Sequence, residues 1–458
     1  MPKDKSTLHG HALHPAIKTF TVGEDYRLDA ALVVYDVAGS VAHATMLKKI
    51  GVLTQKELDA LTKGLRKIAA DFKRGAFEVL PEHEDVHTAV EKTLTDRVGE
   101  SGKKLHTARS RNDQVILDLR LWMKDALLDL AEAIADCATT MVRQANRYKN
   151  VPIVGRTHTQ PAMPSSIGLW LGAFAESLLD DLSLVRAVFD LVDQCPLGSA
   201  ASYGVALPID RALVAKLLGF ARVQNNVLYV NNSRGKVEAA ILAACSQVML
   251  DLSRFAADAI LWSLPEFGYV RFPPDHYPGS SLMPNKRNPG AMEIMRARAA
   301  QVFALEQQCL VNQRGLFSGY NRDNQETKAP LLKGVGITLE SVAVAALAAG
   351  SLIVDKKRCI EAFTPEVFAT DRVLDLVKEE GVTFRDTYYQ VKQEVLDGTL
   401  AGADPVANIK FKTHLGAPGN LGLDRARASI TDAKKWSRAT RRRYHAALAR
   451  LLGGPHRD

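Results

Sequence analysis

Cysteine is scarce in this chain, and its scarcity limits where the protein can work. Five cysteines are scattered over 458 residues, which excludes a dense disulfide framework and is typical of reduced thiols. No apolar run continues unbroken for the roughly 18 residues of a membrane span. The opening residues, MPKDKSTLHGHALHP, contain no apolar stretch of the kind found in a secretory signal. The sequence therefore predicts a cytoplasmic protein with no membrane partner.

Cofactor-binding motifs are also missing. The chain contains no G-x-x-x-x-G-K-[ST] phosphate loop, no G-x-G-x-x-G fingerprint and no cluster of cysteine and histidine ligands. We therefore expect neither a nucleotide cofactor nor a structural metal. One short metal motif does occur, HEDVH, in which His83 and His87 would lie one helical turn apart and could both bind zinc. Only three positions of that pattern are fixed and no Gly-x-x-His follows, so a zinc hydrolase is a minor alternative.

Positive charge is confined to one end of the chain. The formal net charge is +8, but residues 405–458 hold twelve lysines and arginines against three aspartates. The preceding 404 residues therefore sum to −1. No stacking platform or recognised nucleic-acid module accompanies the basic tract, so we expect no nucleic-acid partner. The tract is instead predicted to be a solvated helix face or a docking surface toward another subunit.

Long amphipathic segments, by contrast, are abundant. Residues 113–150 contain no glycine or proline, and apolar side chains recur at three- and four-residue steps, as at Leu119, Met123 and Leu130. Similar patterns occupy 165–194, 236–263, 290–314 and 330–354. Alternating strand patterns are scarce. Helices of this length suit a bundle in which they lie side by side, so the predicted fold class is all-α.

Glycine and proline divide the chain into regions and mark polar loops. The three predicted domains are 1–105 with shorter helices, 106–355 with the long-helix bundle, and 356–458 with shorter segments again. The polar interruptions lie at 102–113, 154–164, 279–289 and 318–328. Each gathers histidine, hydroxyl, amide or cationic side chains where a linker needs only a turn. Helices packed side by side can bring such loops together, which predicts a site for a polyanionic small molecule.

Two of these loops carry residues suited to carboxylate binding. In HTARSRNDQ, Ser110 or Asp113 could cap the following helix, while Arg109 and Arg111 would lie beside its exposed first-turn N–H groups. In RTHTQPAMP, His158 stands between two threonines. A lone histidine is often structural, but the surrounding hydroxyls and amide make a functional role an equal alternative.

A third loop, GSSLMPNKRNP at 279–289, combines backbone freedom with hydroxyls and cations. Gly279 permits movement, Ser280 and Ser281 supply hydroxyls, and Lys286 supplies positive charge beside another cation. Two prolines stiffen the remainder. A movable serine held beside cations suits chemistry in which negative charge develops on a carboxylate substrate.

Together these loops resemble the motifs of one enzyme superfamily. GSSLMPNKRNP is similar to the G-S-S-x-M-P-x-K-x-N-P signature of the fumarase/aspartase superfamily, and HTARSRNDQ resembles the H-T-G-R-S-R-N-D-Q of its argininosuccinate lyases. Other similar segments are YDVAGSVAHATML, EDVH, PLGSAA, YNRDNQETK and GVTFRD. The resemblance extends from about residue 20 to residue 430 of the chain. It implies an all-α, three-domain subunit in a homotetramer, with each active site built from three subunits and without a cofactor.

The resemblance also implies a reaction. The substrate would be a dicarboxylate in which a succinyl group is joined to nitrogen, as in argininosuccinate, and reversible β-elimination would release fumarate and the amine, here arginine. Ser280 would remove the carbon-bound proton, while Lys286 and Asn288 stabilise the aci-carboxylate intermediate. His158 would act on the nitrogen side, oriented and polarised by Glu293. Family accounts differ on whether serine or histidine is the base; we favour Ser280.

Substrate contacts follow from the matched motif positions. The implied set is His87, Arg111, Asn112, Thr157, Ser281, Asn288, Tyr320, Gln325 and Lys328. Asn112 and Thr157 would contact the succinyl portion, and Lys328 would meet a carboxylate. His87 would lie on the amine side, which explains HEDVH better than zinc does.

Several positions depart from the family pattern. Asp25 stands where a substrate-contacting serine is usual, Ala108 replaces the motif glycine, and NNSR at 231–234 replaces S-D-R-D. VGRTHTQPA is closer to adenylosuccinate lyases and fumarases. Because neighbours of the leaving group have changed, two alternatives remain. One is a fumarate-releasing lyase for another N-substituted aspartate, such as adenylosuccinate or an aminocarboxylate; the other is a catalytically silent, crystallin-like protein.

Overall fold

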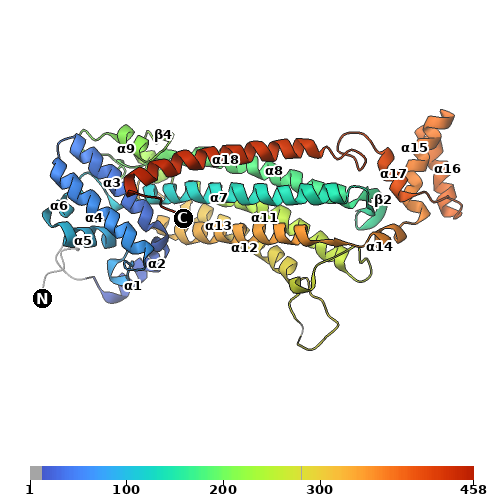
Figure 1. Ribbon diagram of the computed structural model, residues 1–458, viewed down its shortest axis with the longest axis horizontal. Helices are drawn as coiled ribbons and strands as arrows, with labels where there is room; N and C mark the ends of the chain where they lie inside the picture. The colour runs from blue at the N-terminus through green and yellow to red at the C-terminus, as the bar shows by residue number, and fades with distance from the viewer. Residues whose placement is uncertain (1–12, 280, 458) are drawn as a thin grey trace.

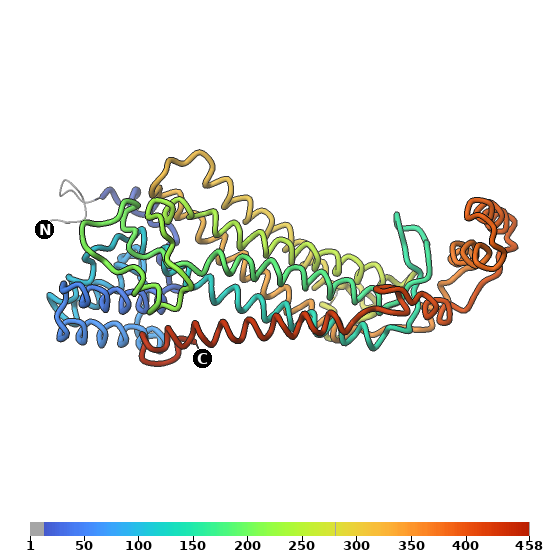
Figure 2. The backbone as a smooth tube through the Cα atoms, turned by 90° about the horizontal axis from the view of Figure 1, so that it is seen from above, coloured from blue at the N-terminus to red at the C-terminus, as the bar shows by residue number. Residues whose placement is uncertain are grey.

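Long helices lie side by side in an elongated bundle (Figure 1), and Figure 2 shows the same arrangement from above. The computed structural model describes residues 13–279 and 281–457. The bundle consists of α7 (Arg111–Arg147), α8 (Ile167–Val192), α11 (Lys236–Ser263), α12 (Gly290–Gln313), α13 (Lys328–Ser351) and α18 (Leu423–Leu452). Strands are few and short in the described residues, so the predicted all-α fold class is confirmed.

Helix α7 begins where the sequence offers a cap. The Ser110 hydroxyl accepts a hydrogen bond from the Asn112 amide at 3.3 Å, and the Asp113 carboxylate accepts one from the Ser110 amide at 3.0 Å. The Ser110 hydroxyl also accepts from the Asp113 amide, so Ser110 and Asp113 form a reciprocal capping box, which satisfies N–H groups that a helix start leaves unpaired. Apolar side chains then recur along the helix and are buried against α8, α13 and α18.

Shorter helices gather at the end of the bundle where α7 begins (Figure 1). Their bounds are α1 (Pro15–Val22), α2 (Asp25–Leu28), η1 (Asp29–Leu32), α3 (Val33–Lys49), α4 (Gln55–Lys73), η2 (Pro81–His83), α5 (Val86–Val98) and α6 (Glu100–Lys104). Three later segments join them: α9 (Arg211–Leu217), α10 (Val227–Asn232) and η4 (Arg322–Thr327). The chain thus returns to this end several times.

HEDVH does not form one continuous helix, so the expectation that its two histidines lie a turn apart is wrong. His83 ends η2 and Val86 begins α5. Between them Glu84 adopts a positive φ of 68°, a left-handed conformation that interrupts a right-handed helix. Asp85 then caps α5 through a hydrogen bond from the Thr88 amide at 2.7 Å.

A β-hairpin projects at the opposite end of the bundle (Figure 1, Figure 2). β1 (Pro152–Thr157) pairs antiparallel with β2 (Gln160–Ser166), and Thr157 lies opposite Gln160. Only His158 and Thr159 remain at the tip, with φ values of 51° and 64°. Positive φ at both central residues is the geometry that two-residue hairpins favour. The sequence predicted only a polar loop here, because neither residue is the usual glycine or asparagine.

Other short elements complete the described chain. Near the hairpin lie α14 (Lys356–Glu361), η5 (Pro365–Phe368), α15 (Ala369–Glu380), α16 (Phe384–Leu396) and α17 (Pro405–Phe411). The remaining elements are β3 (Gln194–Cys195), β4 (Arg222–Val223), β5 (Val270–Arg271), β6 (Ile353–Val354) and η3 (Pro274–His276). All five cysteines are buried and free.

The basic C-terminal tract contains α18, which runs back along α7 (Figure 1). Arg441 lies 2.9 Å from Asp129 of α7. Two histidines, His445 and His456, lie 2.7 and 2.8 Å from the carboxylate of Asp125. Acidic groups of α7 therefore balance part of the positive charge that the sequence concentrates here. The domain boundaries at 105 and 355 stay a prediction.

Within the described part of the chain, three helical segments are long and apolar enough to cross a membrane by length and composition alone: Pro15–Lys49, Lys236–Ser263 and Arg322–Ser351. Charged side chains interrupt each of them, so a search for unbroken apolar runs does not detect them. In the fold, 78%, 61% and 50% of their most apolar windows are buried. Packing inside the protein accounts for much of this apolar character.

Candidate active site

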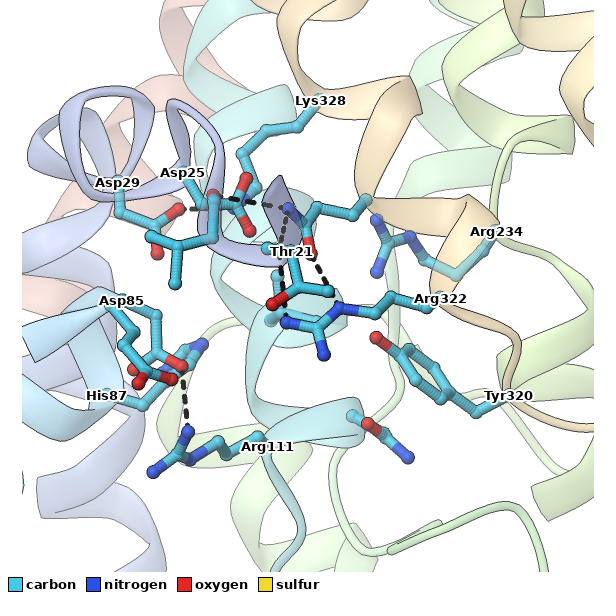
Figure 3. A pocket seen from close by; sticks show the side chains of 15 residues that line it. Thr21, Asp25, Asp29, Asp85, His87, Arg111, Arg234, Tyr320, Arg322 and Lys328 are labelled. Carbon is cyan, nitrogen blue, oxygen red and sulfur yellow. Dashed lines mark hydrogen bonds and ion pairs between the residues drawn. The ribbon is translucent and has the colours of Figure 1, made fainter. Parts of the chain in front are cut away.

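A cavity of about 210 Å³ lies at the end of the bundle that carries α2 and α5 (Figure 3). In Figure 3, Asp25, Asp29 and Asp85 lie on one side, and Arg234 and Arg322 on the other. Residues predicted to contact substrate line this cavity: His87, Arg111, Asn112, Tyr320, Gln325 and Lys328. The fold therefore brings together residues that are more than 200 positions apart.

Lys328 forms a buried charge cluster with Asp25 and Asp29. Its side chain is 2% exposed, and its Nζ contacts Asp25 at 3.1 Å and also Asp29. Burial alone would lower the pKa of Lys328, but the charges of the two carboxylates outweigh it and raise that pKa. Lys328 is thus a paired ammonium group. Its contact with a substrate carboxylate stays a prediction, and such a carboxylate would compete with Asp25 and Asp29.

Arg111 and Asp85 meet at the mouth of the cavity. The guanidinium Nη1 of Arg111 lies 3.3 Å from the Asp85 carboxylate, and half of the Arg111 side chain is exposed. Burial would raise the pKa of Asp85, but the charges of His87 and Arg111 and the hydrogen bonds from Thr88 lower it. Asp85 is therefore ionised, while Arg111 keeps exposed N–H donors for an anionic ligand.

His87 is almost fully buried beneath this cavity. Its Nδ1 lies 2.9 Å from Asp36 of α3 and 3.5 Å from Asp118 of α7. Burial would lower the pKa of His87, but the hydrogen bond to Asp36 and the nearby carboxylates raise it to about 9. The second ring nitrogen, Nε2, is buried and has no hydrogen-bond partner.

The segment before α13 ties the N-terminal helix to the cavity. Gln325 donates hydrogen bonds to the backbone oxygens of Thr21 and Val22 at 3.0 and 3.3 Å, and Arg322 also donates to Thr21 at 3.0 Å. Tyr320 is 40% exposed. These bonds hold the end of α1 against the cavity, so Gln325 shapes the site as well as lining it.

His158 and Thr157 lie away from this cavity. His158 occupies the hairpin tip at the far end of the bundle (Figure 1), and both side chains are exposed. The positive φ of His158 is uncommon for a residue with a side chain. Such backbone strain is often found at functional positions. One chain therefore does not combine His158 with the residues around Lys328.

The loop that carries the superfamily signature, residues 279–289 and called the signature loop below, lies apart from both the cavity and the hairpin tip. Ser280 lies outside the described residues, but Ser281 and Lys286 are exposed, as is Glu293 in the first turn of α12. Asn288 is partly exposed. In Figure 1 the loop that precedes α12 extends from the side of the bundle. The predicted catalytic residues that the structure describes, His158, Lys286 and Glu293, are thus exposed on the surface and are separate from the cavity within a single chain.

Known proteins with similar sequences identify the family. A family model described as a lyase matches residues 16–304. The chain is 43% identical over 417 residues to an argininosuccinate lyase of Sorangium cellulosum, covering 91% of this chain and 96% of that protein. It is 39% identical over 385 residues to an argininosuccinate lyase of Thermotoga neapolitana, covering 84% and 96%.

The chain belongs to the argininosuccinate lyase family. The wider fumarase/aspartase superfamily provides structures with the same fold. A crystal structure of EDDS lyase in complex with formate matches with a TM-score of 0.80, 23% identity and 96% coverage of each chain. A class II fumarase of Schistosoma mansoni matches with a TM-score of 0.69, 15% identity and coverage of 85% and 94%. At these identities the structural matches show the fold alone.

Several charged residues that line the cavity were not predicted from the sequence of this member of the argininosuccinate lyase family. Asp29, Asp85, Arg234 and Arg322 line it but were not predicted to contact substrate. Asp85 belongs to the matched EDVH segment and Arg322 to YNRDNQETK, so their motifs were available signals. Arg234 lies in the divergent NNSR segment, where it is buried and contacts Glu238 at 3.0 Å. The i, i+4 spacing of Arg234 and Glu238 was an available signal for this ion pair, but it does not indicate that Arg234 lines the cavity.

Proposed function

We propose that this protein is a carbon–nitrogen lyase that converts argininosuccinate to arginine and fumarate, and the reverse. The observation that carries the proposal is 43% identity to an argininosuccinate lyase across 91% of the chain. The cavity supports it, because carboxylates and guanidinium groups face one another there (Figure 3). A zwitterionic substrate with carboxylate and guanidinium groups matches both sides.

The proposed chemistry is an anti elimination in two steps. The Ser280 alkoxide removes the proton from the carbon beside one carboxylate, which generates a doubly charged aci-carboxylate. Lys286 and Asn288 stabilise the developing charge. The carbon–nitrogen bond then breaks, its electron pair passes to the nitrogen, and His158, oriented by Glu293, supplies the proton. A serine hydroxyl is a weak base at neutral pH, so cations such as Lys286 are needed to lower its pKa.

We further propose a homotetramer in which three subunits contribute to each active site. The elements that line the cavity, the hairpin tip and the signature loop lie apart in one chain (Figure 1), which supports completion by neighbouring subunits. Exposed apolar side chains on the bundle helices, such as Ile294, Leu310 and Leu347, would be covered in that assembly. Buried free cysteines suit a reducing compartment, so we also propose the cytoplasm.

The first experiment follows fumarate absorbance when the purified protein receives argininosuccinate, with adenylosuccinate and N-alkyl aspartates in parallel. We expect release from argininosuccinate, and at least about a thousandfold lower kcat for Ser280→Ala with assembly unchanged. Release only from another compound would contradict the arginine assignment but not the elimination. Full activity in Ser280→Ala would contradict the role of the serine. An inactive wild-type tetramer would favour a crystallin-like protein.

A further inference from the structure

The buried contacts of His87, a residue that lines the cavity, leave one of its two ring nitrogens without a hydrogen-bond partner. His87 lines the cavity and is 5% exposed. Because Nδ1 is engaged by acidic groups, Nε2 is the nitrogen left without a partner. A buried polar atom without a hydrogen bond is costly. Its position beside a ligand cavity indicates that a bound molecule supplies the missing partner.

The two carboxyl groups that face Nδ1 are not equivalent. Asp36 lies 2.9 Å from Nδ1 and forms a hydrogen bond with it. Asp118 lies 3.5 Å away, and its nearest oxygen, Oδ2, is buried without a hydrogen bond. Burial, followed by the charge of Asp36, raises the pKa of Asp118 well above its ordinary value. Asp118 therefore holds a proton more readily than an ordinary aspartate.

Other ionisable groups lie around the pair on every packed element. Asp29 of η1 and Asp85 at the start of α5 add negative charge near Asp118 and His87. Arg109, which precedes α7, adds positive charge beside Asp36 and Asp118 and donates a hydrogen bond to Ser40 at 2.9 Å. Lys328 pairs with Asp29, and Arg111 pairs with Asp85. The hydrogen bond and charge of Asp36 are therefore the main influences that favour the protonated imidazole.

The protonation state decides what Nε2 can bind. In a neutral imidazole whose Nδ1–H points to Asp36, Nε2 presents a lone pair, which repels a carboxylate oxygen. In the imidazolium, Nε2 carries a proton and donates a charge-assisted hydrogen bond to the same oxygen. The acidic pair therefore controls whether this wall of the cavity attracts or repels an anionic ligand.

We propose that Asp36 and Asp118 are positioning residues that hold His87 as an imidazolium, so that its Nε2–H donates to a succinyl carboxylate oxygen of the bound substrate. This differs from the amine-side position expected from the motif, and fumarate keeps the same carboxylate. The identity of the substrate rests on the proposed function. The charge state of His87 rests on contacts within the chain. His87 acts here as a fixed cation, and it neither gives nor takes a proton in the elimination.

Two asparagine substitutions separate the roles of the acids. Asp36→Asn removes the charge that favours the imidazolium, so at about pH 8 we expect KM to rise at least about tenfold while kcat changes less than about threefold. Its kcat/KM should fall as pH rises from about 6 to about 8, whereas the wild-type value should hold until near pH 9, the pKa of His87. Asp118→Asn resembles the protonated acid and should change KM several-fold less than Asp36→Asn.

A matched control and a second variant guard against loss of folding. Asp258→Asn alters another partly buried aspartate, whose carboxylate accepts a hydrogen bond from Trp170 at 3.0 Å, and an asparagine oxygen can replace that acceptor. We expect its activity to equal that of the wild type. If Asp36→Asn does not assemble, His87→Gln, which keeps a donor but not the charge, should raise KM by a similar factor at all pH values.

Fumarate binding measured by calorimetry on the assembled protein separates this inference from the proposed function. Tighter binding below pH 9 in the wild type, lost near neutral pH in Asp36→Asn, supports the imidazolium even if argininosuccinate is not cleaved. Equal KM values for Asp36→Asn and Asp118→Asn, or identical pH profiles for Asp36→Asn and wild type, would overturn it. The side chains of Asp36, His87 and Asp118 are also close enough together to hold a metal ion. Loss of fumarate binding after chelation would overturn the imidazolium in favour of a metal site. Absence of both turnover and fumarate binding would overturn the inference together with the proposed function.

Discussion

Ala108 shows how a single departure from a family motif places strain on the backbone. It replaces the motif glycine and adopts a φ of 63°, a left-handed conformation that costs an alanine about 1 kcal/mol or more. The strained turn directly precedes Arg109, whose guanidinium group contacts Ser40. The backbone thus keeps the conformation expected of glycine even though the glycine is absent.

Restoring the glycine should therefore stabilise the protein. We expect Ala108→Gly to raise the free energy of unfolding by about 1 kcal/mol, since glycine adopts positive φ without steric cost. Denaturant unfolding measures the change. Ala439→Gly on the exposed face of α18 is the control, and it should lower stability by about 1 kcal/mol because glycine is unfavourable inside a helix. Destabilisation by both variants would show that Ala108 is not strained.

At the same scale, the sequence predicted which residues line the cavity better than it predicted what they contact. His87, Arg111 and Lys328 do line it, because motif positions fix residue types at known points of a shared fold. The pairing of Lys328 with Asp25 and Asp29 escaped prediction, since those partners lie about 300 positions away. Similarly, Asp36 stood in a matched motif and Asp118 in none, and only the packing of α3 against α7 brings them together at His87.

At the scale of elements, α7 and α18 are joined by a cluster of charges and aromatic rings. Asp125 of α7 accepts hydrogen bonds from Tyr35 at 2.7 Å, from His445 and from His456. Burial would raise the pKa of Asp125, but these hydrogen bonds from the histidines and the charge of Arg457 lower it. The end of the chain is thereby fastened to α3 and α7.

Removing one of these contacts should loosen the end of the chain without disturbing the cavity. His456 is 6% exposed, so we expect His456→Ala to lower the free energy of unfolding by about 1–3 kcal/mol. Fumarate release by the folded protein should stay near the wild-type rate, because the cluster lies outside the cavity. Unfolding curves and initial rates test both parts. The exposed His414 supplies the control, and a similar loss of stability in His414→Ala would contradict the argument.

The helices were more predictable than the hairpin for a physical reason. A 3.6-residue period and a Ser110–Asp113 cap are local signals, so the segment predicted at 113–150 is observed as α7, Arg111–Arg147. The β1–β2 hairpin has the tip residues His158 and Thr159, which lack the turn preferences that make hairpins recognisable. Its geometry is imposed by pairing of the strands and not by the tip.

At the scale of the whole molecule, mixing inactive chains tests the proposed shared sites. We expect Ser280→Ala and Lys328→Met tetramers each to be inactive. Tetramers reassembled from equal amounts of the two should regain about a quarter of wild-type activity, because some sites draw both intact residues from different subunits. Fumarate absorbance and sedimentation measure activity and assembly. Two Ser280→Ala preparations mixed in the same way are the control, and no recovery in the mixed sample would mean that Ser280 and Lys328 of each site come from the same chain.

The distance between the hairpin tip and the cavity has a consequence for how the protein behaves on dilution. Helix α7 alone spans 37 residues, about 55 Å, so His158 and Lys328 of one chain stay at opposite ends. If neighbours complete each site, catalysis depends on encounters between chains as well as on substrate. Below the concentration at which subunits separate, specific activity would fall more steeply than the amount of protein, and a dilute extract would look inactive although every chain in it is folded.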